Sequence, residues 1–117
     1  MAASCVRASA LLLLVAVSGC APAPAGRCPN DLPEACPSSA PGYSSVTPIV
    51  QKWCLGCHVG GGLASAVPLD TYVGLYARRE DVLHQVFACK MPPNGREGPT
   101  DGERATLLAW LLCNAPP

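Results

Sequence analysis

The residues with the clearest chemistry are Cys54, Cys57 and His58, which spell C-x-x-C-H within the 117-residue chain. Two thiols three residues apart lie on one helical turn, close enough to add to both vinyl groups of a single haem. The histidine that follows them can offer its imidazole to the iron. The spacing therefore predicts one covalently attached haem c, with Cys54 and Cys57 as thioether residues and His58 as an iron ligand.

Two other kinds of site share part of this motif. A thioredoxin-like redox site also contains W-C-x-x-C, but it needs a β-α-β context and a helix that continues past the cysteines. Here Gly60-Gly61-Gly62 follow instead. A zinc site would need a second cysteine or histidine pair at comparable spacing, and the remaining cysteines are scattered. Haem attachment is the favoured interpretation, with zinc binding and thiol redox chemistry as the alternatives.

The motif must be held by the segment before it. Apolar residues recur there at spacings of three and four, which predicts a helix over residues 46–57. Ser45 or Thr47 is the expected N-cap, and Pro48 is tolerable in the first turn. The glycines after Val59 should end this helix and let the backbone pass close to a porphyrin.

Three further helices are expected. Residues 69–77 and 80–88 each carry one apolar face, and these two helices should pack against the haem. Arg78 to Asp81 should form a solvent-exposed connection between them; the alternative is a docking site for a partner. Thr100 and Glu103 form a capping box, which predicts a last helix over residues 101–113. The expected fold class is all-α, a small helical domain around one covalently bound haem.

A second motif strengthens this interpretation, because Lys90-Met91-Pro92-Pro93 follows 32 residues after His58. Together the two motifs make residues 44–117 resemble a single-haem class I cytochrome c domain. The resemblance implies that Met91 binds the iron opposite His58. Pro92 disfavours a helix at Met91, so an extended loop is expected there. The alternatives are that Met91 only fills a gap in the core, or that His84 is the distal ligand; His84 is more simply a surface histidine.

The same resemblance assigns two supporting roles. It implies that Pro68 offers its carbonyl to the ring N–H of His58, with Leu69 beside it against the haem. It also implies that the last helix crosses the first through an aromatic residue, which makes Trp110 a neighbour of Ile49 or Trp53. The alternative is a surface Trp110 that contacts a partner.

The first residues are typical of export. Residues 1–19 have one positive charge and an apolar stretch too short to span a bilayer, which predicts a signal peptide. Val17-Ser18-Gly19-Cys20 resembles the lipobox of bacterial lipoproteins, so Cys20 is the expected lipidation site; ordinary cleavage near Ala21 or Ala25 is the alternative. Residues 20–43 are rich in proline and should form an extended tether, with the haem domain at 44–117.

Four cysteines remain once Cys5, Cys20 and the haem pair are set aside, and they allow three pairings. Closeness in sequence favours Cys28 with Cys36 and Cys89 with Cys113. The second bond would remove a thiol that could otherwise compete with Met91 for iron. Free or differently paired thiols are the alternative.

The chain has eight basic and eight acidic residues, so nothing in its charge favours nucleic-acid binding. With His58 and Met91 both bound, no iron position is open for a substrate. The expected function is therefore electron transfer, without enzymatic activity, by a monomer anchored through Cys20 on the periplasmic face of a bacterial membrane, between a donor and an acceptor protein. The alternatives are a haem-based ligand sensor in which Met91 dissociates, and a fixed electron-input subunit of a larger redox enzyme.

Overall fold

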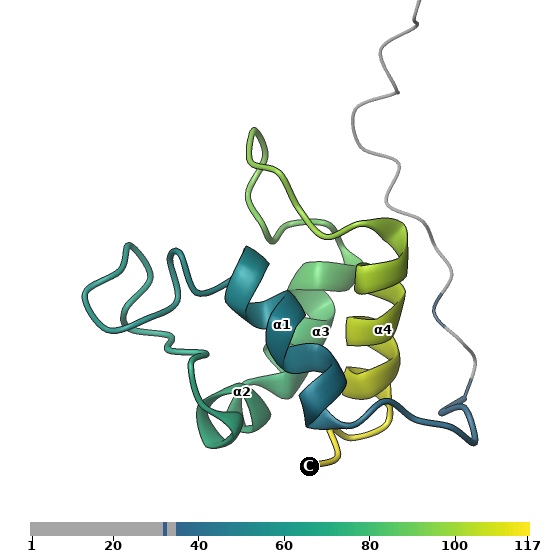
Figure 1. Ribbon diagram of the computed structural model, residues 1–117. Helices are drawn as coiled ribbons and strands as arrows, with labels where there is room; N and C mark the ends of the chain where they lie inside the picture. The colour runs from purple at the N-terminus through teal and green to yellow at the C-terminus, as the bar shows by residue number, and fades with distance from the viewer. Residues whose placement is uncertain (1–31, 33–34) are drawn as a thin grey trace, which may run out of the picture.

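The computed structural model describes residue 32 and residues 35–117 (Figure 1). Over these residues the chain forms four helices and no strand, which agrees with the expected all-α class. The helices are α1 (Tyr43–Trp53), α2 (Tyr72–Ala77), α3 (Arg79–Phe87) and α4 (Asp101–Leu112). None of the helices in the described part of the chain has the length and apolar character needed to cross a membrane.

Helix α1 begins three residues earlier than its apolar spacing predicts. Its N-cap is Gly42, not Ser45 or Thr47, and Pro48 lies inside it. The additional turn is stabilised by tertiary packing. The centroid of the Tyr43 ring lies 5.1 Å from the ring centroid of Tyr72 and 6.0 Å from that of Trp110. The helix also ends earlier, at Trp53, with Cys54 as its C-cap.

Helices α2 and α3 are the expected pair of short helices, separated by a single residue, Arg78. Thr71 caps α2, since its hydroxyl accepts a hydrogen bond from the Gly74 N–H at 3.1 Å. The expected polar joint is shorter than predicted, because Glu80 and Asp81 lie in the first turn of α3. Negative charge there is favourable next to the unpaired N–H groups of a helix start.

Helix α4 has the predicted capping box. The Thr100 hydroxyl accepts from the Glu103 N–H at 3.2 Å, and the Glu103 carboxylate accepts from the Thr100 N–H at 2.9 Å. Trp110 is fully buried, so it does not contact a partner from the surface. It shares the core with Ile49, but its ring neighbour is Tyr43, and its indole N–H donates to the Pro116 carbonyl at 2.7 Å.

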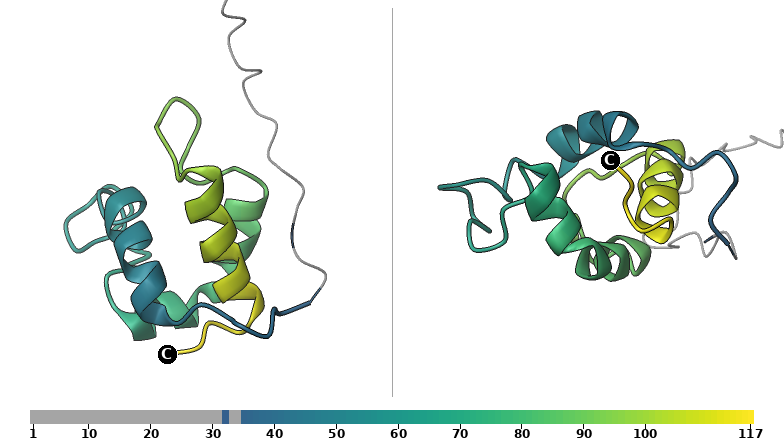
Figure 2. Two further views of the ribbon diagram at one scale, coloured as in Figure 1. Left: turned by 45° about the vertical axis from the view of Figure 1, so that its right-hand side comes forward. Right: turned by 90° about the horizontal axis from the view of Figure 1, so that it is seen from below.

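The core lies where α1 and α3 pack against α4, and the helices surround it when the molecule is seen from below (Figure 2). Its members are apolar side chains from all four helices and from the segments that flank them. The buried apolar residues are Val46, Ile49, Val50, Leu69, Leu75, Val82, Val86, Leu107, Leu108, Trp110, Leu111 and Ala115.

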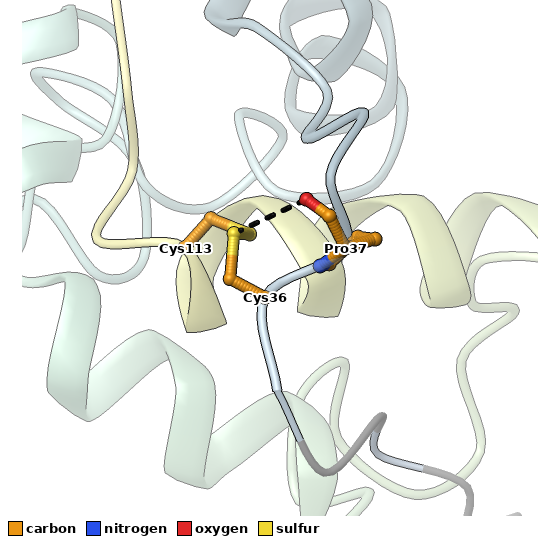
Figure 3. The surroundings of a disulfide bond; sticks show 3 residues. All are labelled: Cys36, Pro37 and Cys113. Carbon is orange, nitrogen blue, oxygen red and sulfur yellow. Dashed lines mark hydrogen bonds between the residues drawn. A yellow bond between two sulfur atoms is a disulfide. The ribbon is translucent and has the colours of Figure 1, made fainter.

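The segment before α1 corrects the disulfide pairing predicted from the sequence. Cys36 is bonded to Cys113, 77 residues away in the sequence, so the predicted pairs Cys28–Cys36 and Cys89–Cys113 are both wrong (Figure 3). The α4 C-terminus brings Cys113 beside Cys36, and closeness in sequence could not reveal this. Leu32, which lies within the predicted tether, packs against the core. The predicted signal peptide, Cys20 and Cys28 lie outside the described residues.

Candidate functional site

The C-x-x-C-H motif forms a hydrogen-bonded turn directly after α1. The Cys54 N–H donates to the Val50 carbonyl at 2.9 Å, as in the helix before it. The Cys57 and His58 N–H groups then both donate to the Cys54 carbonyl, at 3.1 and 3.0 Å. Both thiols and the imidazole are therefore carried by a single hydrogen-bonded turn.

The ring of His58 is oriented by a backbone carbonyl. Its Nδ1 lies 2.9 Å from the oxygen of Val67, whereas the resemblance implied the oxygen of Pro68. The reason is the path of residues 67–69: the Leu69 N–H donates to the His58 carbonyl at 2.9 Å. In an extended segment, successive carbonyls point in opposite directions. Since Val67 O and Leu69 N both face His58, the Pro68 carbonyl faces away.

This contact determines which ring nitrogen can bind a metal. When Nδ1 carries the proton and donates to Val67, Nε2 keeps its lone pair for coordination. The hydrogen bond also fixes the plane of the ring. The Pro68 side chain is exposed, and the Leu69 side chain is buried in the core.

A tightly turned loop brings Val67 back to His58. The Gly62 N–H donates to the Val59 carbonyl at 2.8 Å, and the Ala64 N–H donates to the Cys57 carbonyl at 3.0 Å. Gly62 is required by its surroundings, because a Cβ at this position would overlap the Cys57 oxygen and lie 2.9 Å from the Cys57 carbonyl carbon. The sequence pattern indicated that the glycines end the helix; the structure gives Gly62 a role in closing this loop.

The two thiols are free and partly buried. Burial raises the pKa of the Cys54 thiol to about 11, so it is protonated at neutral pH. A thioredoxin-like nucleophile needs the opposite, a depressed thiol pKa that yields thiolate. The environment of Cys54 therefore disfavours the thiol-redox alternative.

Among the described residues, no three side chains of the His, Cys, Asp or Glu type gather to hold a metal ion.

Met91 lies on a different loop, after α3. The N–H groups of Lys90 and Met91 share the Gln85 carbonyl, at 2.9 and 3.2 Å, and Met91 lies outside the helices, as the proline after it predicts. Met91 is 40% exposed, which argues against the alternative that it only fills a gap in the core. This loop and the C-terminal end of α1 lie at the same end of the molecule (Figure 1). His84 is exposed on α3, as expected of a surface histidine.

A carboxylate joins the last turn of α1, directly before the motif, to α4. The Trp53 indole N–H donates to Glu103 Oε2 at 2.9 Å, and Lys52 Nζ lies 3.2 Å from Glu103 Oε1. The hydrogen bond from the Thr100 backbone, followed by those from Lys52, Trp53 and the Thr100 hydroxyl, lowers the pKa of Glu103 to about 2. The sequence indicated Glu103 only as a capping residue, and nothing local signalled its contact with Trp53.

The chain was compared with protein-family models, curated proteins and solved structures, and none of them matches it.

Proposed function

We propose that the protein is an electron carrier with one haem c, attached through Cys54 and Cys57 and ligated by His58 and Met91. The observation that carries the proposal is the hydrogen bond from His58 Nδ1 to the Val67 carbonyl, on the turn that also bears two free thiols. That arrangement leaves Nε2 of the histidine available beside the two attachment points. The donor set therefore fits a covalently bound haem.

When bound, a haem supplies an iron that exchanges one electron between its ferric and ferrous states. The chain's own residues would hold this group: Cys54 and Cys57 would attach the edge of the ring, and His58 Nε2 and the Met91 thioether would be the ligands of the iron. Two protein ligands leave no position for a substrate, and a methionine ligand raises the reduction potential. This favours electron transfer between two proteins over catalysis.

The location of the carrier is part of the proposal. Lipid on Cys20 would hold the protein at the periplasmic face of a bacterial membrane, and several acyl chains suffice for stable anchoring. The partners would be a donor and an acceptor protein. The alternative, in which the protein is the fixed electron-input subunit of a larger redox enzyme, would require the same haem and the same ligands.

A second candidate is a haem-based ligand binder in which Met91 dissociates. The 40% exposure of Met91, on a loop outside the helices, favours this candidate. Carbon monoxide separates the two functions. A carrier keeps Met91 on the iron and excludes the gas, whereas a ligand binder admits it rapidly.

The test uses the full chain, exported in a host that attaches haem c. We expect haem that stays with the polypeptide after denaturation, a methionine-to-iron charge-transfer band in the oxidised protein, and no rapid carbon monoxide binding in the reduced protein. Met91→Ala should lose the band, bind carbon monoxide and lower the reduction potential, while the matched control His84→Ala should change none of these. A polypeptide without covalent haem refutes the proposal, and rapid gas binding by the wild type selects the second candidate.

A further inference from the structure

The first turn of α4 contacts both segments that carry a proposed iron ligand. Glu103 accepts a hydrogen bond from the Trp53 indole N–H at 2.9 Å, and Trp53 is the last residue of α1, directly before the C-x-x-C-H motif. The next residue, Arg104, donates from its guanidinium to the Phe87 carbonyl at 3.0 Å. Phe87 is the last residue of α3, before the Met91 loop. Two consecutive residues thus contact α1 and α3 at the end of the molecule where both of these helices end (Figure 1).

We propose that the first turn of α4 is a brace that sets the separation between the His58 segment and the Met91 loop, with Arg104 as the positioning residue for Met91. The effect of this brace on the iron rests on the proposed function. Its effect on the Met91 loop does not depend on haem and can be measured without it.

Arg104 is a charged side chain among buried apolar ones. It is 8% exposed, and within residues 32 and 35–117 it is the only charged residue that is buried. Burial of a guanidinium is unfavourable unless hydrogen bonds compensate, and arginine cannot lose its proton to avoid this cost. The bond to Phe87 supplies part of the compensation. It also places positive charge at the C-terminal end of α3, where the helix dipole favours a cation.

Helix α3 ends in a tight turn that leads into the Met91 loop. The Cys89 N–H donates to the Val86 carbonyl at 3.1 Å, and the Lys90 N–H donates to the Gln85 carbonyl at 2.9 Å, which is the pattern of a Schellman C-cap. Cys89 has the left-handed conformation that this motif needs, with a φ of 52°. That conformation is unfavourable for residues other than glycine. The contacts around the turn must therefore hold it in place.

The brace connects this turn to the other ligand segment. Phe87 lies within the turn, so the bond from Arg104 stabilises it. On the other side, Glu103 binds Trp53, and its capping box with Thr100 fixes the start of α4. Two segments far apart in the sequence are thus held at a fixed separation by one turn of helix.

The first test is backbone amide hydrogen exchange in the full chain. In Arg104→Leu, we expect the Lys90 and Met91 N–H groups to exchange about tenfold faster than in the wild type, the factor that corresponds to loss of one charged hydrogen bond. The Arg78 N–H, which donates to the Leu75 carbonyl at the end of α2, should keep its rate.

The matched control is Arg79→Leu. Arg79 donates from its guanidinium to the Tyr76 carbonyl at 3.1 Å, close to the C-terminal end of α2, so the control loses the same kind of bond at another helix. It should speed exchange of the Arg78 N–H and leave the Lys90 and Met91 rates unchanged. Equal increases at both places in both variants would report only global unfolding and would overturn the proposal.

The second test reads the iron in the haem-containing protein. Trp53→Phe removes the indole donor and keeps an aromatic ring. We expect its methionine-to-iron band to weaken at a lower temperature than in the wild type, although Trp53 adjoins the other ligand segment. The matched control is Tyr72→Phe, which removes the bond from the Tyr72 hydroxyl to the Ala115 carbonyl at 3.0 Å and should leave the band unchanged. An unchanged band in Trp53→Phe overturns the brace.

The exchange test also separates this inference from the proposed function. A chain without covalent haem refutes the proposed function, and exchange in Arg104→Leu still decides whether Arg104 holds the Met91 loop. If that variant does not accumulate as folded protein, Arg104→Gln takes its place, because the shorter, uncharged side chain also loses the charged bond to Phe87. Wild-type exchange at Lys90 and Met91 in the folded variant overturns the proposal.

Discussion

Gly62 offers the sharpest test of how the loop after His58 is held. In Gly62→Ala, the new Cβ would overlap the Cys57 oxygen and lie 3.0 Å from the Val59 oxygen, so the loop must move away from both. The carbonyl of Cys57 cannot give way freely, because it accepts the hydrogen bond from the Ala64 N–H at 3.0 Å. The substitution therefore acts on the residue directly before the proposed iron ligand.

The size of the effect follows from what the movement breaks. Loss of the bond between Ala64 and Cys57 costs about 1 kcal/mol, and up to about 3 kcal/mol where the separated groups stay shielded from water. We expect the free energy of unfolding to fall by that range, about 1–3 kcal/mol. The His58 ring loses its fixed approach to Val67 at the same time, so less haem should be attached per chain.

The assay compares Gly62→Ala with Gly60→Ala in the same loop. A Cβ at Gly60 meets nothing within 4 Å, so this control should stay within about 0.5 kcal/mol of the wild type. Urea unfolding followed by circular dichroism gives the stability, and haem absorbance per polypeptide gives the attachment. Equal stability and equal haem content in the two variants would refute the reasoning.

Two further predictions concern the cross-link and the carboxylate that hold α4. Cys36→Ser/Cys113→Ser removes a cross-link that spans 77 residues, and the chain-entropy model predicts that the free energy of unfolding falls by about 4.5 kcal/mol. Neither cysteine is buried, so the substitution leaves no cavity that would add to this loss. A fall of less than about 1 kcal/mol, measured by urea unfolding without reductant, would contradict the prediction. The pKa of Glu103 is lowered from 4.5 to about 2, so its stabilising contribution is present above pH 4.5 and is lost as the pH falls towards 2. The melting temperature of the wild type should therefore fall more steeply than that of Glu103→Gln across this window, and parallel curves would count against the prediction.

The sequence predicted the positions of the helices more accurately than the contacts between them. Apolar spacing located all four helices, and the capping box of Thr100 and Glu103 fixed where α4 begins, because these signals act within one or two turns of chain. The boundaries of α1 were less accurate, since its first turn depends on Tyr43 packing against Tyr72 and Trp110. Ring contacts between distant segments leave no local pattern.

The sequence by itself determined the proposed donor set, because the spacing of Cys54, Cys57 and His58 is fixed by the covalent chain. Tertiary structure decided how that set is held. The carbonyl that orients His58 belongs to Val67 rather than Pro68, because the direction of a carbonyl depends on how residues 67–69 pass the histidine. Cys36 joins Cys113 rather than Cys28, because disulfide pairing follows distance in space, and folding brings the segment before α1 to the end of α4.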